Sequence, residues 1–571
     1  MKLHKLLIIA IGLSVFYTKL PAQTPVRQVD ISLVKYMPER PFPYKMKNWK
    51  RIAQKQDSLF FDFNAKGPFL PLIWWDDTKT NFPGRAFGLP SYVGSLRNME
   101  KKSHYEALPV LGAILGASLV GIDKSEYNGH DFVTMCKQFY NKANGQNLIL
   151  NTPNAKAGGS FWYELFPGMT FNMIVDQYPA NQEISALMKM NAENWLPVID
   201  NLSKGRPYPD FNFTSYDFQT GKGFYNNRWR EPDAAAGMAW LQFTAWKKFG
   251  DKKFLDASKA SMEFLQHRLA REGVFYEIMM PYGAYLAVRM NAEMGTEYDE
   301  LKMLNWCFDG NNSDRDGWGV VAERWGAYDA HGLVGQKKWE HYAFAMNTFS
   351  HAAALVPIVK YNPAYANTIG KWLLNLSNAS RLFYVDEHPR NRQTSAVWDG
   401  DPEHLICYEG VRKNLDNKNF FQVFKGVLAD EGPYGLGDQV KHGTSFTDIC
   451  PYGSAWVGML GGIVDTTNVD MILRLDCNAT DFFGNRTFPT YLYYNPYPEE
   501  KEVLYAAGNK PVKLYDLIEK KFLPGVVQGN IKLNIAAEQS RLLVQVPADA
   551  LVVTKNNRLT ATGAVIDYKV K

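Results

Sequence analysis

The segment 323–332 holds the densest group of chemically useful side chains in the sequence. It brings the carboxyl groups of Glu323 and Asp329, the phenol of Tyr328 and the imidazole of His331 within nine positions. Such groups can act as general acid and base if the segment folds over a cleft. An ordinary salt bridge from Glu323 to a neighbouring arginine would instead make the segment structural, and both interpretations stay open.

Two later polar segments add carboxyl groups that could complete a catalytic pair. Glu409 lies in an otherwise apolar setting, where burial would raise its pKa and suit it to donate a proton. Asp448 follows a run of glycine and hydroxyl residues, so it fits a helix N-cap or an exposed acid equally well. We expect a pair that joins one of Glu323 and Asp329 to one of Glu409 and Asp448.

Aromatic residues beside charged ones favour contact with a ligand that has both apolar and polar faces. An arginine such as Arg228 or Arg230 can hold a carboxylate or sulfate with two hydrogen bonds, and Trp229 between them can stack on a sugar. Asp233 fits a helix N-cap better than a catalyst. The predicted substrate-binding residues are Trp75, Asp76, Trp162, Trp229, Arg230, Trp325, Tyr328, His331 and His442.

One partial motif competes for the same residues. Asn312, Asp314, Asp316, Gly317 and Glu323 have the spacing of a twelve-residue calcium loop, in which Glu323 would be a ligand. The position that is usually apolar is a glycine, so we expect no metal. Nucleophile-elbow, phosphate-loop and zinc-pair motifs are absent from the sequence, and we expect no cofactor.

The elements that must position these residues are six predicted helix pairs. The first members are apolar on nearly every side and must be buried. The second members carry one charged face and belong outside. The first members begin near His104, Ser160, Asp233, Met279, Tyr342 and Gly453, and the second near Asp131, Asn181, Asp251, Glu297, Pro363 and Val469. Such an alternation closes into a double ring whose inner helices line a cleft.

The segments outside the pairs differ in pattern. Residues 23–100 are rich in Pro and Gly and predict an irregular or short-stranded arm before the toroid, which we place at 101–485. Within 486–571, Ile531, Leu533 and Ile535 alternate with polar residues, as strands do. We expect a small C-terminal β-sandwich-like domain there.

Composition and the first residues bear on location and partners. Residues 1–22 combine Lys2 and Lys5 with a short apolar stretch and a small-residue cleavage site, which predicts a signal peptide. Its removal leaves 60 basic against 58 acidic residues, since three of the 63 are lost. This balance does not favour nucleic-acid binding. A mean hydropathy of −0.30 argues against a polytopic membrane protein. We therefore expect a periplasmic or secreted protein that binds carbohydrate, with no membrane insertion of the mature chain.

The five cysteines are scattered and odd in number. One bridge, between Cys450 and Cys477, would suit an exported protein. Buried free thiols are the favoured interpretation, because a chain of this length can fold without a bridge.

The sequence resembles the six-hairpin glycosidase superfamily. The resemblance rests on the helix pairs, on the runs Asp233–Met238 and Gly453–Gly458, and on the trailing strands. The resemblance implies an (α/α)6 toroid and an activity on sugars, but no catalytic residue is carried over by it. The leading hypothesis is an exported glycoside hydrolase with two carboxyl groups across the cleft. A polysaccharide lyase using Tyr328 or Tyr408 with Arg230, His331 or His442 is the second, and a non-catalytic glycan-binding protein the third.

Overall fold

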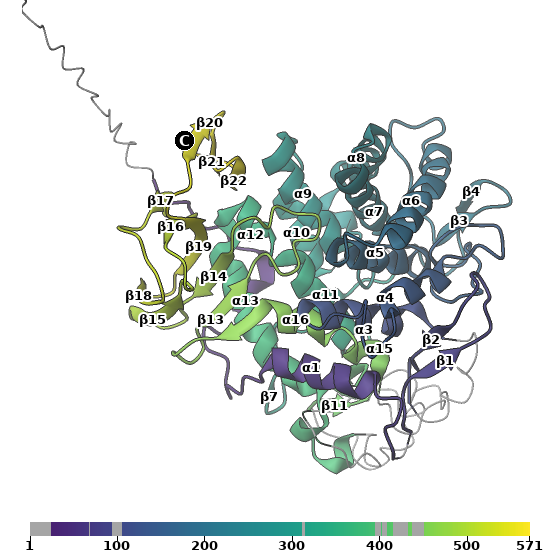
Figure 1. Ribbon diagram of the computed structural model, residues 1–571, viewed down its shortest axis with the longest axis horizontal. Helices are drawn as coiled ribbons and strands as arrows, with labels where there is room; N and C mark the ends of the chain where they lie inside the picture. Colours follow the sequence, from purple (N-terminus) through teal and green to yellow (C-terminus); the bar gives the residue numbers. More distant parts are fainter. Residues whose placement is uncertain are drawn as a thin grey trace, which may run out of the picture.

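A computed structural model describes residues 24–67, 69–93, 105–310, 314–393, 401, 403, 408–414, 432–436 and 450–570. Six helices form its inner layer: α3 (Ala107–Leu119), α5 (Phe161–Gln177), α7 (Ala234–Phe249), α9 (Met280–Met294), α11 (Ala345–Leu355) and α16 (Val457–Ile463). Each of them contacts the next in this order, and α16 contacts α3, so the ring is closed (Figure 1).

Small residues allow these inner helices to approach closely. A Cβ atom on Gly458 of α16 would lie 2.3 Å from the Cα of Gly116 on α3. A Cβ atom on Gly283 of α9 would lie 2.6 Å from the Cβ of Ala236 on α7. Since closely packed interiors leave no room for an added methyl group, the glycines and alanines of the apolar segments are what lets the ring close.

The outer layer surrounds this ring. It consists of α4 (Phe132–Met135) with the 3-10 helix Cys136–Phe139, α6 (Gln182–Leu202), α8 (Lys252–His267), α10 (Glu300–Asp309), α12 (Ile358–Tyr361) with α13 (Ala366–Ala379), and α1 (Trp49–Phe60). Side chains cap the starts of several of them, as Asn181 does by accepting from the N–H of Ile184 at 3.2 Å. The predicted (α/α)6 toroid is thus confirmed.

Two expectations about individual elements were wrong. The arm before the toroid contains α1, which packs beside α16 and α3 and takes the sixth outer position. The second member expected near Val469 is instead the strand pair β12 (Val464–Thr466) and β13 (Leu473–Asp476). Leu473 and Leu475 are buried while Arg474 and Asp476 between and after them are less so, which is the period of a strand and not of a helix.

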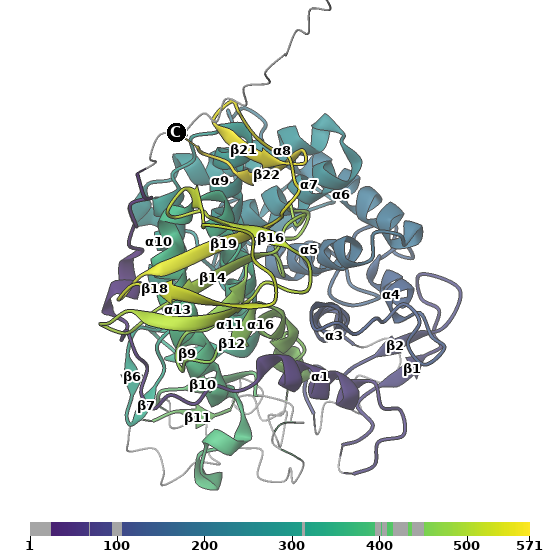
Figure 2. The same ribbon diagram turned by 60° about the vertical axis from the view of Figure 1, so that its left-hand side comes forward.

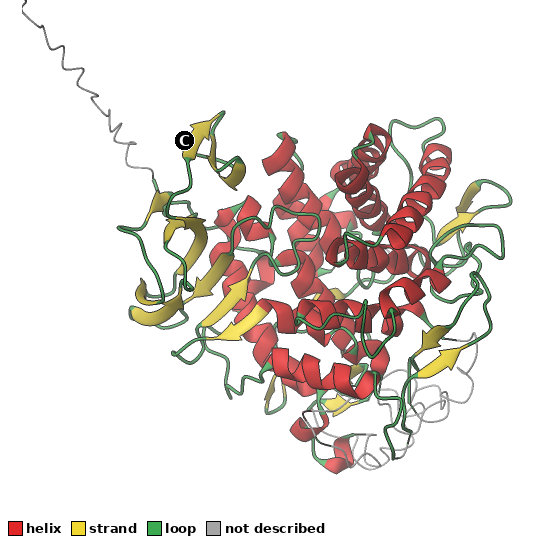
Figure 3. Ribbon diagram, viewed as in Figure 1, coloured by secondary structure: helices red, strands yellow, loops and turns green. Residues whose placement is uncertain are grey.

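The C-terminal part is rich in strands, as expected, and lies at one side of the helices (Figure 3). One sheet has the order β12-β13-β14-β19-β16-β17, with β14 (Thr490–Tyr494), β19 (Ser540–Pro547), β16 (Val512–Asp516) and β17 (Lys521–Phe522). The pair β15 (Lys501–Ala506) and β18 (Asn530–Ile535) shares a small apolar core with it through residues such as Val503, Leu514 and Leu533. A last sheet joins β20 (Val552–Lys555), β21 (Arg558–Ala561) and β22 (Ala564–Asp567).

In the turned view β14 and β19 lie on α13, which they contact (Figure 2). The division of the chain into domains stays a prediction.

A five-stranded sheet stands before α11 and matters for the site. Its order is β11 (Tyr434–Gly435), β10 (Gly410–Arg412), β9 (Tyr342–Phe344), β8 (Val334–Gln336) and β5 (Trp318–Val320). The register places Trp318, Gln336, Tyr342 and Arg412 in one row across these strands, so their side chains share a face.

Cys136, Cys307, Cys450 and Cys477 are free and buried. A bridge between Cys450 and Cys477 is therefore excluded, and Cys407 lies outside the described residues.

Among the helices that the structure describes, none has the length and apolar character needed to cross a bilayer.

Candidate active site at the mouth of the toroid

The segments that lead into successive inner helices meet at one end of the ring, here called the mouth. The carboxylate of Glu231, before α7, accepts from the hydroxyl of Ser160 and the N–H of Trp162 at the start of α5, each at 2.8 Å. Asp233 accepts from the N–H of Met279 at the start of α9 at 3.3 Å. These bonds join three neighbouring helix starts directly.

The contacts continue from α7 towards α9 and the five-stranded sheet. Trp229 donates its indole N–H to Glu231 at 3.1 Å, and the guanidinium of Arg315 lies 5.5 Å from the centre of the Trp229 ring. Arg315 also pairs with Glu277, before α9, at 3.8 Å and with Glu340 at 3.4 Å.

From Glu340 the contacts pass to the segment before α11. Glu340 pairs with Arg412 at 3.7 Å, and the guanidinium of Arg412 lies 3.7 Å from the centre of the Tyr342 ring. Glu409 accepts from the phenol of Tyr342 at 2.6 Å and from that of Tyr92 at 2.7 Å. Glu409 is buried, so these two donors stabilise its ionised form in place of water.

Aromatic stacking closes the circuit. The Tyr92 ring lies 5.8 Å from that of Tyr452 in α15 (Pro451–Ser454), and Tyr452 lies 6.4 Å from Trp162 on α5. We call this closed series of contacts the mouth ring. It comprises Tyr92, Trp162, Trp229, Glu231, Arg315, Glu340, Tyr342, Glu409, Arg412 and Tyr452.

Carboxyl groups of the mouth perturb the phenols of Tyr163 and Tyr452. Burial raises the pKa of both phenols, and the nearby charges of Glu106, Glu277 and Glu409 raise it further. Tyr163 itself remains 44% exposed, and its ring lies 4.3 Å from that of Trp162.

Two of these carboxyl groups differ in their surroundings. Glu106 accepts from Ser91 and, at 2.8 Å, from Asn151; burial raises its pKa, and the two donors offset only part of that rise. Glu277 has a left-handed backbone with φ of 61°, which costs a non-glycine residue roughly 1–2 kcal/mol. The side-chain amide of Asn347 on α11 donates to the backbone carbonyl of Glu277 at 2.8 Å, and the side chain of Glu277 is 23% exposed. Strain of this kind is typical of functional positions.

Two further buried carboxyl groups hold the mouth in shape. Glu164 accepts from the N–H groups of Gly158, Gly159 and Ser160 at 2.7, 2.8 and 3.1 Å, which fixes the turn before α5. Burial raises the pKa of Glu164 to about 7 and that of Glu231 to about 8, against the hydrogen bonds that lower both.

Of the residues predicted from sequence, the structure places Glu409, Trp162 and Trp229 in the mouth ring. The residues of the cluster 323–332 lie outside the mouth ring, and they contact different parts of the chain. Glu323 accepts from Trp325 at 3.0 Å and pairs with Lys413 at 3.1 Å.

Asp329 and His331 lie in the segment between α10 and α11. Asp329 pairs with His331 at 2.6 Å and accepts from the N–H of Phe42 at 3.3 Å, so it fastens the N-terminal segment. Burial opposes ionisation of Asp329, but His331 outweighs it and holds the pKa below its usual value. Tyr328 stacks on His388 at 6.3 Å.

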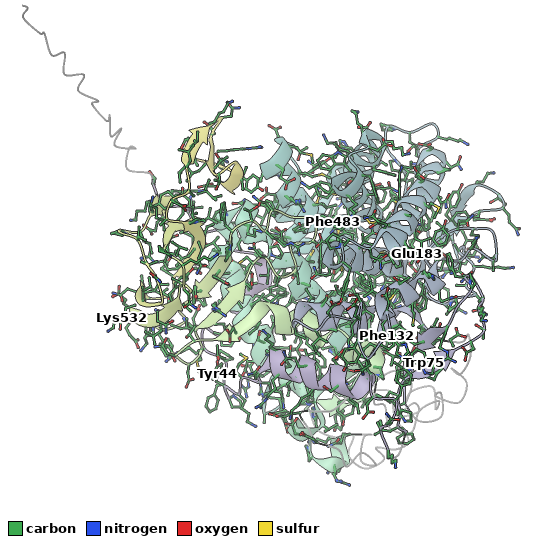
Figure 4. All side chains as sticks on the ribbon, in the orientation of Figure 1. Tyr44, Trp75, Phe132, Glu183, Phe483 and Lys532 are labelled. Carbon is green, nitrogen blue, oxygen red and sulfur yellow. The ribbon has the colours of Figure 1, made fainter. Side chains whose placement is uncertain are left out.

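The other predicted binding residues have structural partners. Arg230 binds both carboxylate oxygens of Asp314 at 3.1 Å. Trp75 stacks on Phe132 with ring centres 6.0 Å apart, and the two are labelled side by side in Figure 4. Asp76 accepts from the phenol of Tyr105 at 2.8 Å.

Three expected positions, Asn312, His442 and Asp448, lie outside the described residues. The other acids of the calcium-loop pattern each pair with a cation: Asp314 with Arg230, Asp316 with Lys338, and Glu323 with Lys413. Glu106, Glu277, Tyr342 and Tyr452 were missed from the sequence. The signal that could have found them is position, because each lies one to five residues before the first residue of an inner helix.

Comparison with known proteins finds no matching family model and no matching curated protein. A GH127 beta-L-arabinofuranosidase from Geobacillus stearothermophilus T6 is 9% identical over 91% of this chain and 85% of its own, with a TM-score of 0.40. A metagenome-derived family 9 endoglucanase is 11% identical over 73% and 80%, with a TM-score of 0.38. Endoglucanase CelQ from Clostridium thermocellum, complexed with cellotriose, is 11% identical over 92% and 99%, with a TM-score of 0.33. All three are glycoside hydrolases, in line with the resemblance inferred from sequence, but these scores are too low to carry an argument about activity.

Proposed function

We propose that the chain is an exported glycoside hydrolase whose active site is the mouth of the toroid. The observation that carries the proposal is the closed mouth ring, in which Glu409 accepts from the phenols of Tyr92 and Tyr342. Beside it, Glu106 accepts from the hydroxyl of Ser91, whose carbonyl accepts from the N–H of Tyr452. Aromatic faces and several carboxyl groups at one mouth suit a sugar ring and acid–base cleavage of its bond.

The three glutamates have different surroundings, and we assign each of them a different role on that basis. Glu106, whose pKa burial raises, is the proton donor to the leaving oxygen. Glu409, which accepts from two phenols, is the ionised partner that activates water or attacks the sugar. Glu277, paired with Arg315, orients the substrate.

Hydrolysis fits the described part of the mouth better than uronate elimination does. A lyase needs a phenol or imidazole base and a cation for the uronate carboxylate. The pKa values of Tyr92, Tyr163 and Tyr452 are raised, first by burial and then by neighbouring carboxylates. Arg315 and Arg412 each pair with a glutamate. The mouth therefore favours neutral sugars.

The test is a screen of plant and microbial polysaccharides for release of reducing sugar, with absorbance of unsaturated uronides as the sign of a lyase. On a substrate that is cleaved, Glu106→Gln and Glu409→Gln should each lower kcat by about 10²–10⁴-fold without unfolding the protein. The matched control is Glu183→Gln on α6, an exposed glutamate paired with Lys137 (Figure 4).

Full activity in both mouth variants would overturn the assignment. Loss of activity in Glu323→Gln or Asp329→Asn, with the mouth variants active, would return catalysis to the cluster 323–332. Accumulation of unsaturated uronides would establish the lyase instead, and tight binding without turnover would support a binding protein.

A further inference from the structure

The turn between β8 and β9, residues 337–341, presents an indole in a fixed orientation. Trp339 is 69% exposed. Its indole N–H donates to Asp316 at 2.6 Å, and the ammonium of Lys338, which also pairs with Asp316, lies 5.1 Å from the ring centre. The ring is thus held while its surface stays open to solvent.

The backbone of this turn is organised by one buried side chain. The amide oxygen of Gln336 accepts from the N–H groups of Lys338, Trp339 and Glu340 at 3.1, 2.8 and 3.0 Å. Gln336 itself is only 2% exposed. Because the turn is ordered before any ligand arrives, binding to Trp339 would cost little conformational entropy.

The turn is also docked on the preceding segment. The N–H of Lys337 donates to the carbonyl of Gly317 at 2.9 Å. A Cβ atom on Gly317 would lie 2.5 Å from the Cβ of Lys338, and its φ is 103°, so a glycine is needed here.

A cleft of about 770 Å³ lies beside the turn and reaches α10; we call it the α10 cleft. This volume is within the range of about 300–1,000 Å³ usual for small-molecule sites. Its charged lining is balanced, with three cations and three anions: Lys302, Lys337, Lys338, Asp309, Asp316 and Glu323. Asp316 both lines the cleft and holds the Trp339 indole, so the indole stands at its rim.

The α10 cleft and the mouth ring are lined by different residues, since no residue that lines the cleft belongs to the ring. The two adjoin at the Trp339 turn, where Glu340 belongs to the mouth ring while Lys337, Lys338 and His341 line the cleft.

We infer that the Trp339 turn and the α10 cleft form a second saccharide-binding site for a neutral sugar chain. The apolar face of one sugar stacks on the Trp339 indole, and hydroxyl groups of its neighbours pair with donors and acceptors in the cleft, such as Asn305 and Asp309. The balanced charge disfavours an anionic ligand, and the six charged side chains would be costly to bury under a lipid chain. This site goes beyond the proposed function and does not need the mouth to be catalytic.

The test is electrophoresis of the full chain in native gels that contain arabinan, xylan, mixed-linkage β-glucan or galactomannan. At least one of these should retard the wild type. Trp339→Ala should weaken that binding about tenfold or more, and Trp339→Tyr should restore part of it. Phe224→Ala is the matched control, because Phe224 is another exposed aromatic residue, on β4 (Lys222–Phe224).

Retardation that is the same in Trp339→Ala and wild type, or no retardation in any gel, would overturn this inference. Repeating the gels with Glu409→Gln separates it from the proposed function. Binding that depends on Trp339 should persist in that variant whether or not the mouth cleaves sugars.

Discussion

The two ends of the toroid both contain buried charges, but they use them differently. At the mouth, the described carboxyl groups outnumber the described cations, and the partners of Glu409 and Glu106 include hydroxyl groups. At the far end, Asp481 is fully buried and accepts from Lys360 at 2.6 Å, from Tyr285 at 2.7 Å and from Tyr361 at 3.0 Å. We call these four residues with Arg289 the far-end cluster.

The far-end cluster joins the helices to the strand-rich part. Arg289 on α9 donates to the carbonyls of Phe482 and Phe483 at 3.2 and 2.6 Å. Burial alone would raise the pKa of Asp481, but Lys360 and Arg289 outweigh it and hold the pKa below its usual value. A buried charge held by several donors, as at Asp481, specifies structure, whereas the carboxyl groups of the mouth lie beside aromatic rings, an arrangement suited to chemistry.

The largest expected effect is therefore at the far end. Asp481→Ala should lower the free energy of unfolding by about 3–5 kcal/mol, because it leaves Lys360 buried without its counter-charge. Urea unfolding measures this loss. The exposed pair of Asp465 and Arg474 supplies the control, and Asp465→Asn should change stability by about 0–1 kcal/mol.

A double variant sharpens this prediction. Replacing both partners, as Asp481→Leu with Lys360→Met, should recover part of the lost stability, since a well-packed apolar pair can substitute for a buried ion pair. If Asp481→Ala were as stable as the wild type, the far-end cluster would not hold the two parts together.

The next effect is a pH dependence that arises at the mouth. The pKa of Glu164 is about 7 in the folded chain, above the usual value of 4.5, so the folded state holds its proton more tightly than the unfolded chain does. Its contribution is fully present below pH 4.5 and is lost as the pH rises through 7, which amounts to about 3 kcal/mol.

Glu164→Gln should remove this part of the pH dependence. Its amide oxygen can still accept from the backbone of Gly158, Gly159 and Ser160, while its amide N–H can donate to Ser215. Unfolding free energies measured from pH 4.5 to 9 should fall less steeply in the variant. Identical slopes would show that Glu164 ionises normally in the folded chain.

Sequence alone predicted the toroid because inner and outer helices differ in periodicity and polarity. It failed at α1, although Trp49, Ile52, Ala53, Gln56 and Leu59 follow the helical spacing, because the surrounding Pro and Gly residues suggested an irregular arm. It failed near Val469 because four alternating residues are too few to distinguish a strand with certainty from the edge of a helix.

The site was predicted only in part, for a different reason. Glu409 was recognisable because a carboxyl group in an apolar run must find buried partners. The dense cluster 323–332 does not join the mouth ring, and its Asp329 instead accepts from the backbone of Phe42, which lies 287 residues earlier. Glu106 and Glu277 stand alone in sequence, and only the closed ring brings them to Glu409. For locating the mouth residues in this sequence, a high local density of reactive side chains is thus a weaker guide than the position of a residue relative to the start of a helix.

Matched phenols allow the two ends to be compared by the same substitution. Tyr361→Phe removes a hydroxyl that contacts both oxygens of Asp481 at 3.0 Å. We expect a loss of about 1.5–3 kcal/mol, the range for hydrogen bonds to charged groups, with activity unchanged once the protein is folded. A fall in kcat without a fall in stability would show that the far end communicates with the mouth.

Tyr342→Phe is the counterpart at the mouth and should have the smaller effect on stability. The hydroxyl donates to Glu409 at 2.6 Å, but Glu409 keeps the bond from Tyr92. We expect a stability loss of about 1 kcal/mol. Turnover of a substrate from the polysaccharide screen should change more, with a several-fold fall in kcat, because Tyr342 also holds the carboxyl group of Glu409 in position. An unchanged kcat, with an intact fold, would place Glu409 outside the acid–base pair.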